Sequence, residues 1–263
     1  MCNDEIKANG WSAMPANAGA IFTDQSFIKR VEAVQLDTIK FPFDDPVVSK
    51  TLEYARAVLH PQTLNHSMRV YFYGMSIGNI SLCIYSLRHI TTGMVITTQQ
   101  FPELAASLSP ATWALTCLLH DIGTAEENLT ATRMSFDIYG GIKALHVLKE
   151  FGATADQAEA VAEAIIRHQD MGVDGTITYF GQLIQLATTY DNTGVHPHVK
   201  GFEGLVHRTT RRQINEAYPR LKWCEFFSGV IRKEEAIKPW CHSTHLVDFD
   251  KEIEANTVMR EYE

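Results

Sequence analysis

The sequence lacks the features of a secreted protein stabilised by disulfides. Its 263 residues include only five cysteines, an odd number, widely scattered and without a CxxC pair. Such cysteine usage fits a reducing compartment better than a disulfide framework. The first residues, MCNDEIKANGWSAMP, carry early acidic side chains and no apolar h-region, which argues against a signal peptide. We therefore expect a cytoplasmic protein.

An excess of positive charge is also missing. Lys and Arg number 23 against 31 Asp and Glu, which gives a formal net charge of -8 at pH 7. This balance argues against attraction of the whole chain to nucleic acid or to an anionic membrane surface. The net charge does not exclude a local basic pocket. We expect a small-molecule substrate and no nucleic-acid or membrane partner.

One uncharged run raises the question of a membrane span. Residues 70–87, VYFYGMSIGNISLCIYSL, approach the roughly 20 apolar residues that a transmembrane helix needs. The run nevertheless contains two glycines, three serines and an asparagine, and no aromatic belt frames it. We expect it to belong to a soluble protein.

Strand signals are scarce, and helical signals dominate. The only short β-branched runs are MVITT at 94–98 and GTITYF at 175–180, and both are weak. Ser109 suits a helix N-cap, Pro110 suits the first helical position, and Gly123 suits the helix end. Thr154 and Gln157 have the spacing of a capping box. These patterns predict an all-α fold.

The chain shows no internal repeat or long linker, and its length suits one larger domain. We expect a single helical bundle over residues 45–245. An irregular N-terminal segment, 1–44, is expected to wrap the core, and residues 246–263 are expected to form a C-terminal tail.

Several polar residues stand where an apolar helix face ends. In TCLLHDIGT, His120 and Asp121 directly follow an apolar run. His168 and Asp191 each extend the apolar stripe of a helix. His66 begins another apolar helical segment. Adjacent helical side chains diverge by about 100°, so His120 and Asp121 can reach one atom only near a helix end. Ordinary helix-end polar residues would explain the same pattern.

A metal site is the alternative explanation for these residues. A buried carboxylate without a partner is costly, so it must be paired, protonated or bound to a metal. Two imidazoles and two carboxylates form a nitrogen and oxygen donor set that suits zinc, manganese or iron and is poor for calcium.

Longer motifs favour the metal site over ordinary helix-end residues. NHSMR, LLHDIGT, AIIRHQD and ATTYDN resemble the HD-domain superfamily of metal-dependent hydrolases. MSFDIYGGI, INEAYPRLKW and KPWCHSTH further resemble the cyanamide hydratases, a branch that adds water to cyanamide to form urea. The similarity runs from about Asp45 to about His245. It implies an HD-domain bundle, a hydro-lyase acting on cyanamide or a related small nitrile, and self-association into a homo-oligomer.

The resemblance also implies a set of metal ligands. His66, His120, Asp121 and Asp191 match the four positions that hold the metal, which is expected to be Zn²⁺, although Fe²⁺ and Mn²⁺ accept the same ligands. Two-metal members of the superfamily have a further histidine early in the next helix. The corresponding stretch here reads MSFDIYGG, which favours one ion per subunit.

The same likeness implies a role for His168, and a mechanistic hypothesis adds the substrate-binding residues. His168 matches a histidine near the substrate, and we expect it, with Asp121, to be catalytic. The expected chemistry is attack of metal-activated water on the nitrile carbon, with His168 as an acid of near-neutral pKa that protonates nitrogen. Thr188, Asn192 and Asp170 are the predicted substrate-binding residues, with Asp170 orienting His168. A core histidine and a packing threonine are the alternatives for His168 and Thr188.

Two other functions compete with cyanamide hydration. An HD phosphohydrolase acting on nucleotide monophosphates or cyclic phosphodiesters would need Arg69, Arg167 and Lys143 to converge on the metal. An inactive HD scaffold would bind no stoichiometric metal.

The sequence departs from the family pattern at an extra segment, about residues 78–98, whose length exceeds ordinary connections of roughly four to six residues. The remaining candidates for a second metal site are predicted to be loop and tail residues: His196, His198, Cys241, His242 and His245.

Overall fold

The computed structural model describes residues 3–22, 33–76 and 107–263. Helices make up most of the regular structure in these ranges, beside one short antiparallel sheet, which confirms the predicted all-α class. The elements are α1 (Asn3–Ala8), β1 (Ala13–Pro15), α2 (Pro46–Val58), α3 (Pro61–Ser76), α6 (Pro110–Leu119), α7 (Glu126–Ala131), α8 (Phe136–Phe151), α9 (Ala155–Ile166), β2 (Thr176–Thr178), α10 (Tyr179–Asn192), α11 (Arg208–Ala217), α12 (Trp223–Ile237) and α13 (Phe249–Glu254). Short 3₁₀ turns cover Ala18–Ala20, Leu36–Thr38, Ile122–Thr124, Phe202–Leu205, His242–His245 and Arg260–Tyr262.

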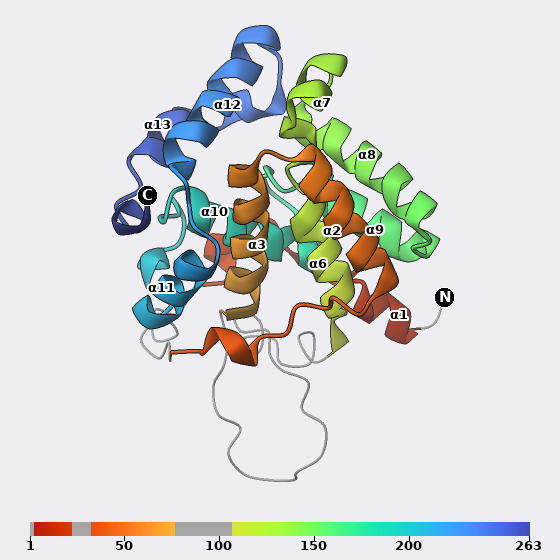
Figure 1. The fold of residues 1–263 in the computed structure, drawn as a ribbon. Coiled ribbons are helices and arrows are strands. Elements are labelled where there is room, and N and C mark those ends of the chain that lie inside the picture. Colours follow the sequence, from red (N-terminus) through yellow and green to blue (C-terminus); the bar gives the residue numbers. More distant parts are fainter. Residues whose placement is uncertain (1–2, 23–32, 77–106) are drawn as a thin grey trace.

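Helices α6 and α10 form the buried centre of the molecule. Every residue of α10 is buried, and α6 is buried from Thr112 to its end. Figure 1 shows α3 and α6 in the middle, α8 and α9 on one side, and α11 and α13 on the other. The site described below lies where α3, α6 and α10 meet the α12–α13 pair.

The predicted helix caps are confirmed, but one glycine has a different role. The Ser109 hydroxyl accepts from the Thr112 N–H, and Pro110 opens α6. Gly123 does not cap this helix, because α6 ends at Leu119 and Gly123 lies in the 3₁₀ turn that follows. A Cβ on Gly123 would lie 2.0 Å from the Phe136 carbonyl oxygen. Glycine is therefore required for close backbone approach to the start of α8.

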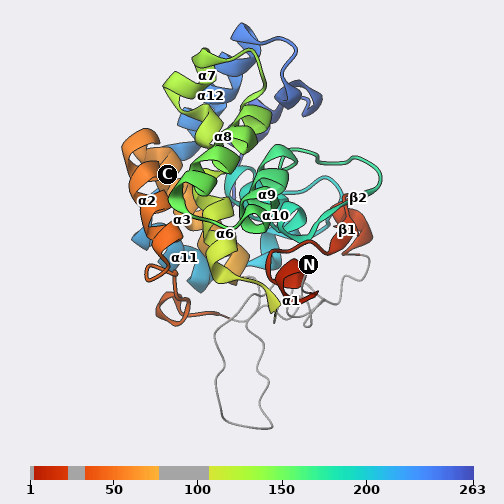
Figure 2. The same ribbon diagram turned by 90° about the vertical axis from the view of Figure 1, so that its right-hand side faces the viewer.

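The N-terminal segment packs against the helices that carry the site. Strand β1 pairs antiparallel with β2, with Ala13 opposite Thr178, beside α9 and α10 (Figure 2). Helix α10 begins directly after β2, and the Tyr179 N–H donates to the Ser12 carbonyl. This pairing confirms the weak strand signal at 175–180 and fixes the start of α10.

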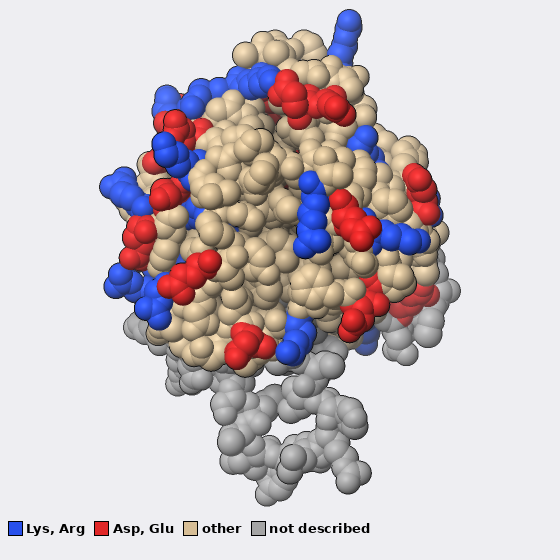
Figure 3. All heavy atoms as spheres, in the orientation of Figure 1, with Lys and Arg blue, Asp and Glu red and all other residues tan. Residues whose placement is uncertain are grey.

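Some sequence expectations fall on residues that the structure does not describe. The extra segment at about 78–98 lies outside the described ranges, as do the MVITT run and most of the uncharged run after residue 76. Among the helices of the described ranges, none combines the length and apolar character that crossing a membrane requires. On the face shown in Figure 3, Lys and Arg are interspersed with Asp and Glu rather than gathered into one basic patch.

Candidate metal centre and pocket

Two histidines and an aspartate converge in the buried centre of the fold. His66 Nε2 lies 3.1 Å from His120 Nε2 and 3.6 Å from Asp121 Oδ2, and His120 Nε2 lies 3.2 Å from the same oxygen. His120 retains helical dihedral angles as the C-cap of α6, whereas Asp121 has left the helix (φ -100°, ψ 14°). This change of backbone direction lets adjacent side chains point at one place.

The hydrogen bonds behind these residues fix where their lone pairs point. His120 Nδ1 lies 2.8 Å from the Cys117 carbonyl oxygen, and His66 Nδ1 lies 2.6 Å from Asp191 Oδ2. Because both partners can only accept, each Nδ1 carries a proton, and each imidazole in its neutral form presents an Nε2 lone pair to the cluster. Asp121 Oδ2 is buried without a hydrogen-bond partner. Three electron-rich atoms thus face one another, an arrangement that a divalent cation stabilises.

The electrostatics of the cluster favour ligand forms at two of its three members. Burial lowers the pKa of His66 to about 4, which keeps this imidazole neutral. Burial opposes ionisation of Asp121, but His120 and His66 favour it more and lower the pKa of Asp121 to about 2. In turn Asp121 raises the pKa of His120 despite burial. A proton on His120 is therefore the competitor that a metal ion has to displace.

Asp191, the fourth predicted ligand, lies outside this cluster. It sits at the Nδ1 edge of the His66 ring, away from the Nε2 atom that faces the other two residues. Arg69 donates to both of its carboxylate oxygens, and Arg220 Nη1 donates to Oδ1 at 2.6 Å. The two guanidinium groups hold the pKa of Asp191 well below its usual range although burial opposes ionisation. The geometry differs here from the expected set of four ligands, because these donors occupy the carboxylate.

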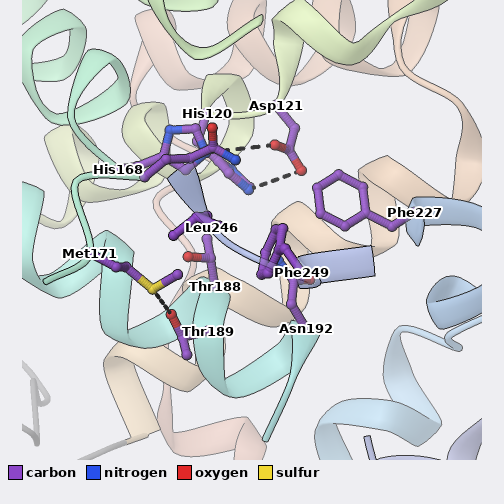
Figure 4. Close-up of a pocket in the computed structure, with 11 residues that line it drawn as sticks. His120, Asp121, His168, Met171, Thr188, Thr189, Asn192, Phe227, Leu246 and Phe249 are labelled. Atoms are coloured by element: carbon purple, nitrogen blue, oxygen red, sulfur yellow. Dashed lines mark hydrogen bonds and ion pairs between the residues drawn. The ribbon is translucent and has the colours of Figure 1, made fainter. Parts of the chain in front are cut away.

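A small pocket opens at the cluster (Figure 4). The space available to the centre of a water-sized molecule is about 20 Å³. One water needs roughly 10–15 Å³ by this measure, so the pocket admits only a very small molecule. The lining residues are His120, Asp121, His168, Gln169, Met171, Thr188, Thr189, Asn192, Phe227, Leu246 and Phe249.

His168 lines the pocket beside the cluster, where the sequence predicts it. Its Nδ1 donates to the Ile165 carbonyl at 2.6 Å, and its Nε2 lies 4.0 Å from Asp121 Oδ1. Burial, and then the neighbouring His120, lower the pKa of His168. This differs from the expected acid of near-neutral pKa, because a neutral imidazole whose Nδ1 is engaged offers Nε2 as a proton acceptor.

Thr188 and Asn192 also line the pocket, one turn apart on α10. The Thr188 hydroxyl donates to the Ile184 carbonyl at 2.8 Å, so its oxygen lone pairs remain for a ligand. Asn192 Oδ1 accepts from Trp223 Nε1 at 2.8 Å, which fixes the orientation of the side-chain amide. Both residues present polar atoms within reach of the pocket.

Asp170 is placed differently from the expectation. It is absent from the pocket lining, and it accepts from Arg167 Nε at 2.7 Å while His242 Nε2 lies 3.6 Å away. The helix ends at Ile166, and the chain then turns, so Asp170 does not follow His168 along one helix face. The carbonyl of Ile165, rather than Asp170, orients His168.

Sequence reasoning missed the apolar wall of the pocket. Leu246 and Phe249, from the predicted tail, close one side. The other missed lining residues are Gln169, Met171, Thr189 and Phe227. No motif marks Met171, Phe227, Leu246 or Phe249, because an apolar residue that lines a cavity has the same sequence signal as one in the core.

The candidate phosphate-binding cations do not reach the pocket. Arg69 is buried against Asp191, and Arg167 pairs with Asp170. Lys143 is not among the lining residues, and neither Lys nor Arg is found there in the described chain. The requirement of a phosphohydrolase for convergent cations is not met.

The remaining histidine and cysteine candidates form no further three-ligand group in the described ranges. His196 and His198 contact each other through their rings, and His242 and His245 stack with their ring centroids 4.5 Å apart. Cys241 is buried as a free thiol. This agrees with their interpretation as loop and tail residues.

The fold and the site together define an all-helical protein with a buried His–His–Asp cluster at the base of a very small pocket. No family model matches the chain. Two curated relatives from Saccharomyces cerevisiae, cyanamide hydratase DDI2 and cyanamide hydratase DDI3, are each 40% identical to it over 207 residues. The match covers 78% of this chain and 80% of each relative. The chain belongs to the cyanamide hydratase family.

Proposed function

We propose that this protein hydrates cyanamide to urea and that it does so with a divalent metal ion, Zn²⁺ by preference, in an HD-domain helical bundle over residues 45–245. The observation that carries the proposal is the pocket, which joins a metal-type donor cluster to space for only a very small molecule. Both yeast relatives are cyanamide hydratases, which supports the choice of substrate.

His66, His120 and Asp121 would hold the ion. The unpartnered Asp121 oxygen and the two facing Nε2 atoms fit a cation, and three protein ligands are typical of catalytic rather than structural zinc sites. When bound, a metal of this kind supplies Lewis acidity and lowers the pKa of water. Fe²⁺ and Mn²⁺ accept the same donor types.

The chain's own residues would move the proton. Hydration forms a bond between a water oxygen and the nitrile carbon, transfers one water proton to the nitrile nitrogen, and reaches urea by a second proton shift. His168 Nε2 faces the pocket as an acceptor, and we assign it to take the proton from water and return it to nitrogen. This shuttle starts from neutral imidazole, in accord with the lowered pKa of His168.

Two side chains of α10 would orient the substrate. The Thr188 oxygen is free to accept an N–H from the amine of cyanamide, and the Asn192 amide is held by Trp223 at the same wall. The opposite wall, which includes Phe227, Leu246 and Phe249, excludes competing water from the reaction. Asp170 has no role in this assignment, because it does not line the pocket.

The phosphohydrolase alternative loses support. The pocket has no lining cation in the described chain, and its size is far below that of a nucleotide. Cytoplasmic location and homo-oligomerisation stay predictions of the sequence.

The decisive experiment measures urea release from cyanamide, with and without a chelator, alongside metal analysis of the purified protein. We expect urea release that the chelator abolishes and that added Zn²⁺ restores. His120→Ala should lose both metal and activity, whereas His168→Ala should keep the metal and lose about 10²–10⁴-fold in turnover, the usual contribution of general acid–base catalysis. Absence of urea from the metal-loaded protein would overturn the proposal.

A further inference from the structure

We propose that Asp191 is a positioning residue rather than a ligand, and that Arg220 and Glu263 form with it a relay of charged groups that fixes His66 for metal binding. This inference rests on the proposed function, since it concerns the same cluster. It goes further by extending the machinery of the site to the C-terminal segment.

The first link joins Asp191 to His66. Its Oδ2 accepts from His66 Nδ1 at 2.6 Å, which places the remaining lone pair of the ring on Nε2. Metal-binding histidines commonly donate their second ring N–H to a carboxylate, which sets the tautomer and the ring orientation. Asp191 occupies this second position, on the far edge of the ring from the cluster.

The second link holds Asp191 itself. Arg69 Nη2 donates to Oδ2 at 2.8 Å, and Arg220 donates from Nη1 to Oδ1 at 2.6 Å and from Nη2 to the Asp191 carbonyl at 3.2 Å. All three side chains are fully buried. These contacts leave the carboxylate with little freedom to rotate towards the cluster.

The third link reaches Glu263. Its Oε1 accepts from Arg220 Nε at 2.6 Å, and its Oε2 accepts from the Cys224 N–H at 3.3 Å. With this partly exposed carboxylate, whose side chain is 23% accessible, the set contains two guanidinium groups and two carboxylates, so its charges balance. Removal of Glu263 leaves the positive charge of Arg220 balanced by Asp191 alone. Asp191 then interacts more with Arg220, and its hydrogen bond with His66 Nδ1 weakens.

The chain provides a matched control for this relay. Glu261 is also an acidic residue of the last turn, and it pairs with Arg208 at 3.0 Å on the exposed surface, away from His66. Glu263→Ala and Glu261→Ala therefore remove equal charge from neighbouring positions, and only the first breaks the relay. Asp191→Asn tests the inner link directly.

The experiment measures Zn²⁺ affinity by competition with a chromophoric chelator, and records the visible spectrum of the Co²⁺-loaded protein. Asp191→Asn should weaken Zn²⁺ binding about 10–100-fold, the usual effect of losing such a partner, and Glu263→Ala should weaken it by a smaller factor. Both variants should alter the Co²⁺ spectrum, and Glu261→Ala should alter neither property.

A second readout does not depend on metal. In the metal-free protein, ¹⁵N NMR should find His66 as the Nδ1–H tautomer, with Asp191→Asn and Glu263→Ala changing the tautomer ratio. Wild-type protein that binds no Zn²⁺ would overturn the proposed function and this inference together. If the wild-type protein binds Zn²⁺, and both relay variants keep its affinity and its His66 tautomer, the relay alone is overturned. The relay is also overturned if Asp191→Asn abolishes Co²⁺ binding completely, as His120→Ala is expected to do, because Asp191 would then act as a ligand.

Discussion

Trp223 stacks face to face on His66, with ring centroids 4.2 Å apart and 11° between the ring planes. The same indole donates from Nε1 to Asn192 Oδ1 at 2.8 Å. One fully buried side chain thus supports both a proposed metal ligand and a proposed substrate-binding residue.

Trp223→Phe should separate these two functions. Phenylalanine retains a ring for stacking but cannot donate to Asn192, whose buried carbonyl then lacks its partner. We expect unchanged Zn²⁺ affinity, a rise in KM for cyanamide, and a loss of about 1–3 kcal/mol in the free energy of unfolding. Chelator competition, steady-state kinetics and urea denaturation measure the three quantities. Equal loss of metal affinity and substrate affinity would contradict this division.

Phe249→Ala should change substrate preference by removing part of the apolar wall. The pocket would then admit N-alkyl cyanamides, and their kcat/KM relative to cyanamide should rise, because a wall atom no longer occupies that space. A stability loss of about 3–5 kcal/mol accompanies such a truncation. Ile253→Ala is the control, since Ile253 is buried on the same α13 helix but does not line the pocket. A similar change of preference in the control would attribute the effect to loosening of α13.

Gly123→Ala should destabilise the protein and displace the adjacent ligands. The added methyl group would meet the Phe136 carbonyl oxygen at 2.0 Å, and the backbone must move to accommodate it. We expect a loss of about 1–3 kcal/mol in unfolding free energy, with weaker metal binding. At Gly229, in α12, a Cβ has no neighbour within 4 Å. Gly229→Ala should therefore stabilise the helix by about 0.5–1 kcal/mol, and thermal unfolding compares the two variants.

His196 should make the fold sensitive to acid. Burial, and then His198, lower the pKa of His196 to about 4. The unfolded chain, with an ordinary pKa of about 6.5, binds a proton in the intervening window that the folded chain does not. Stability should therefore be fully present above pH 6.5 and fall between about pH 6.5 and 4, by about 3 kcal/mol from this group.

His196→Asn tests that pH dependence. The asparagine carbonyl can still accept from the His198 N–H, which His196 Nδ1 accepts in the structure. Urea denaturation between pH 4 and 8 should show a flatter stability profile for the variant. Parallel profiles for both proteins would assign the acid sensitivity to other groups.

Local sequence signals predicted much of the fold and the core of the site. Ser109 and Thr154 cap their helices as expected, and the position of His120 and Asp121 at a helix end accounts for their convergence. These features depend on neighbours within one helical turn. They can therefore be inferred without knowledge of tertiary contacts.

The contacts of Asp191 could not be predicted in this way. Its place on the apolar stripe correctly indicated burial, but its partner Arg220 lies 29 residues further along the chain, before α12. Asp170 was predicted to orient His168, but the chain turns after Ile166 and Asp170 accepts from Arg167 instead. Leu246 and Phe249 reach the pocket only through the packing of α13 on α12. Tertiary geometry decides each of these outcomes.

The late position of Leu246 and Phe249 has a consequence for biosynthesis. A ribosome releases His66, His120 and Asp121 long before it releases the residues that close the apolar wall. Until α13 docks, the nascent chain would expose its metal-type donors to water and to any cation in the surroundings. Folding of this enzyme would thus end, rather than begin, with the closure of its pocket.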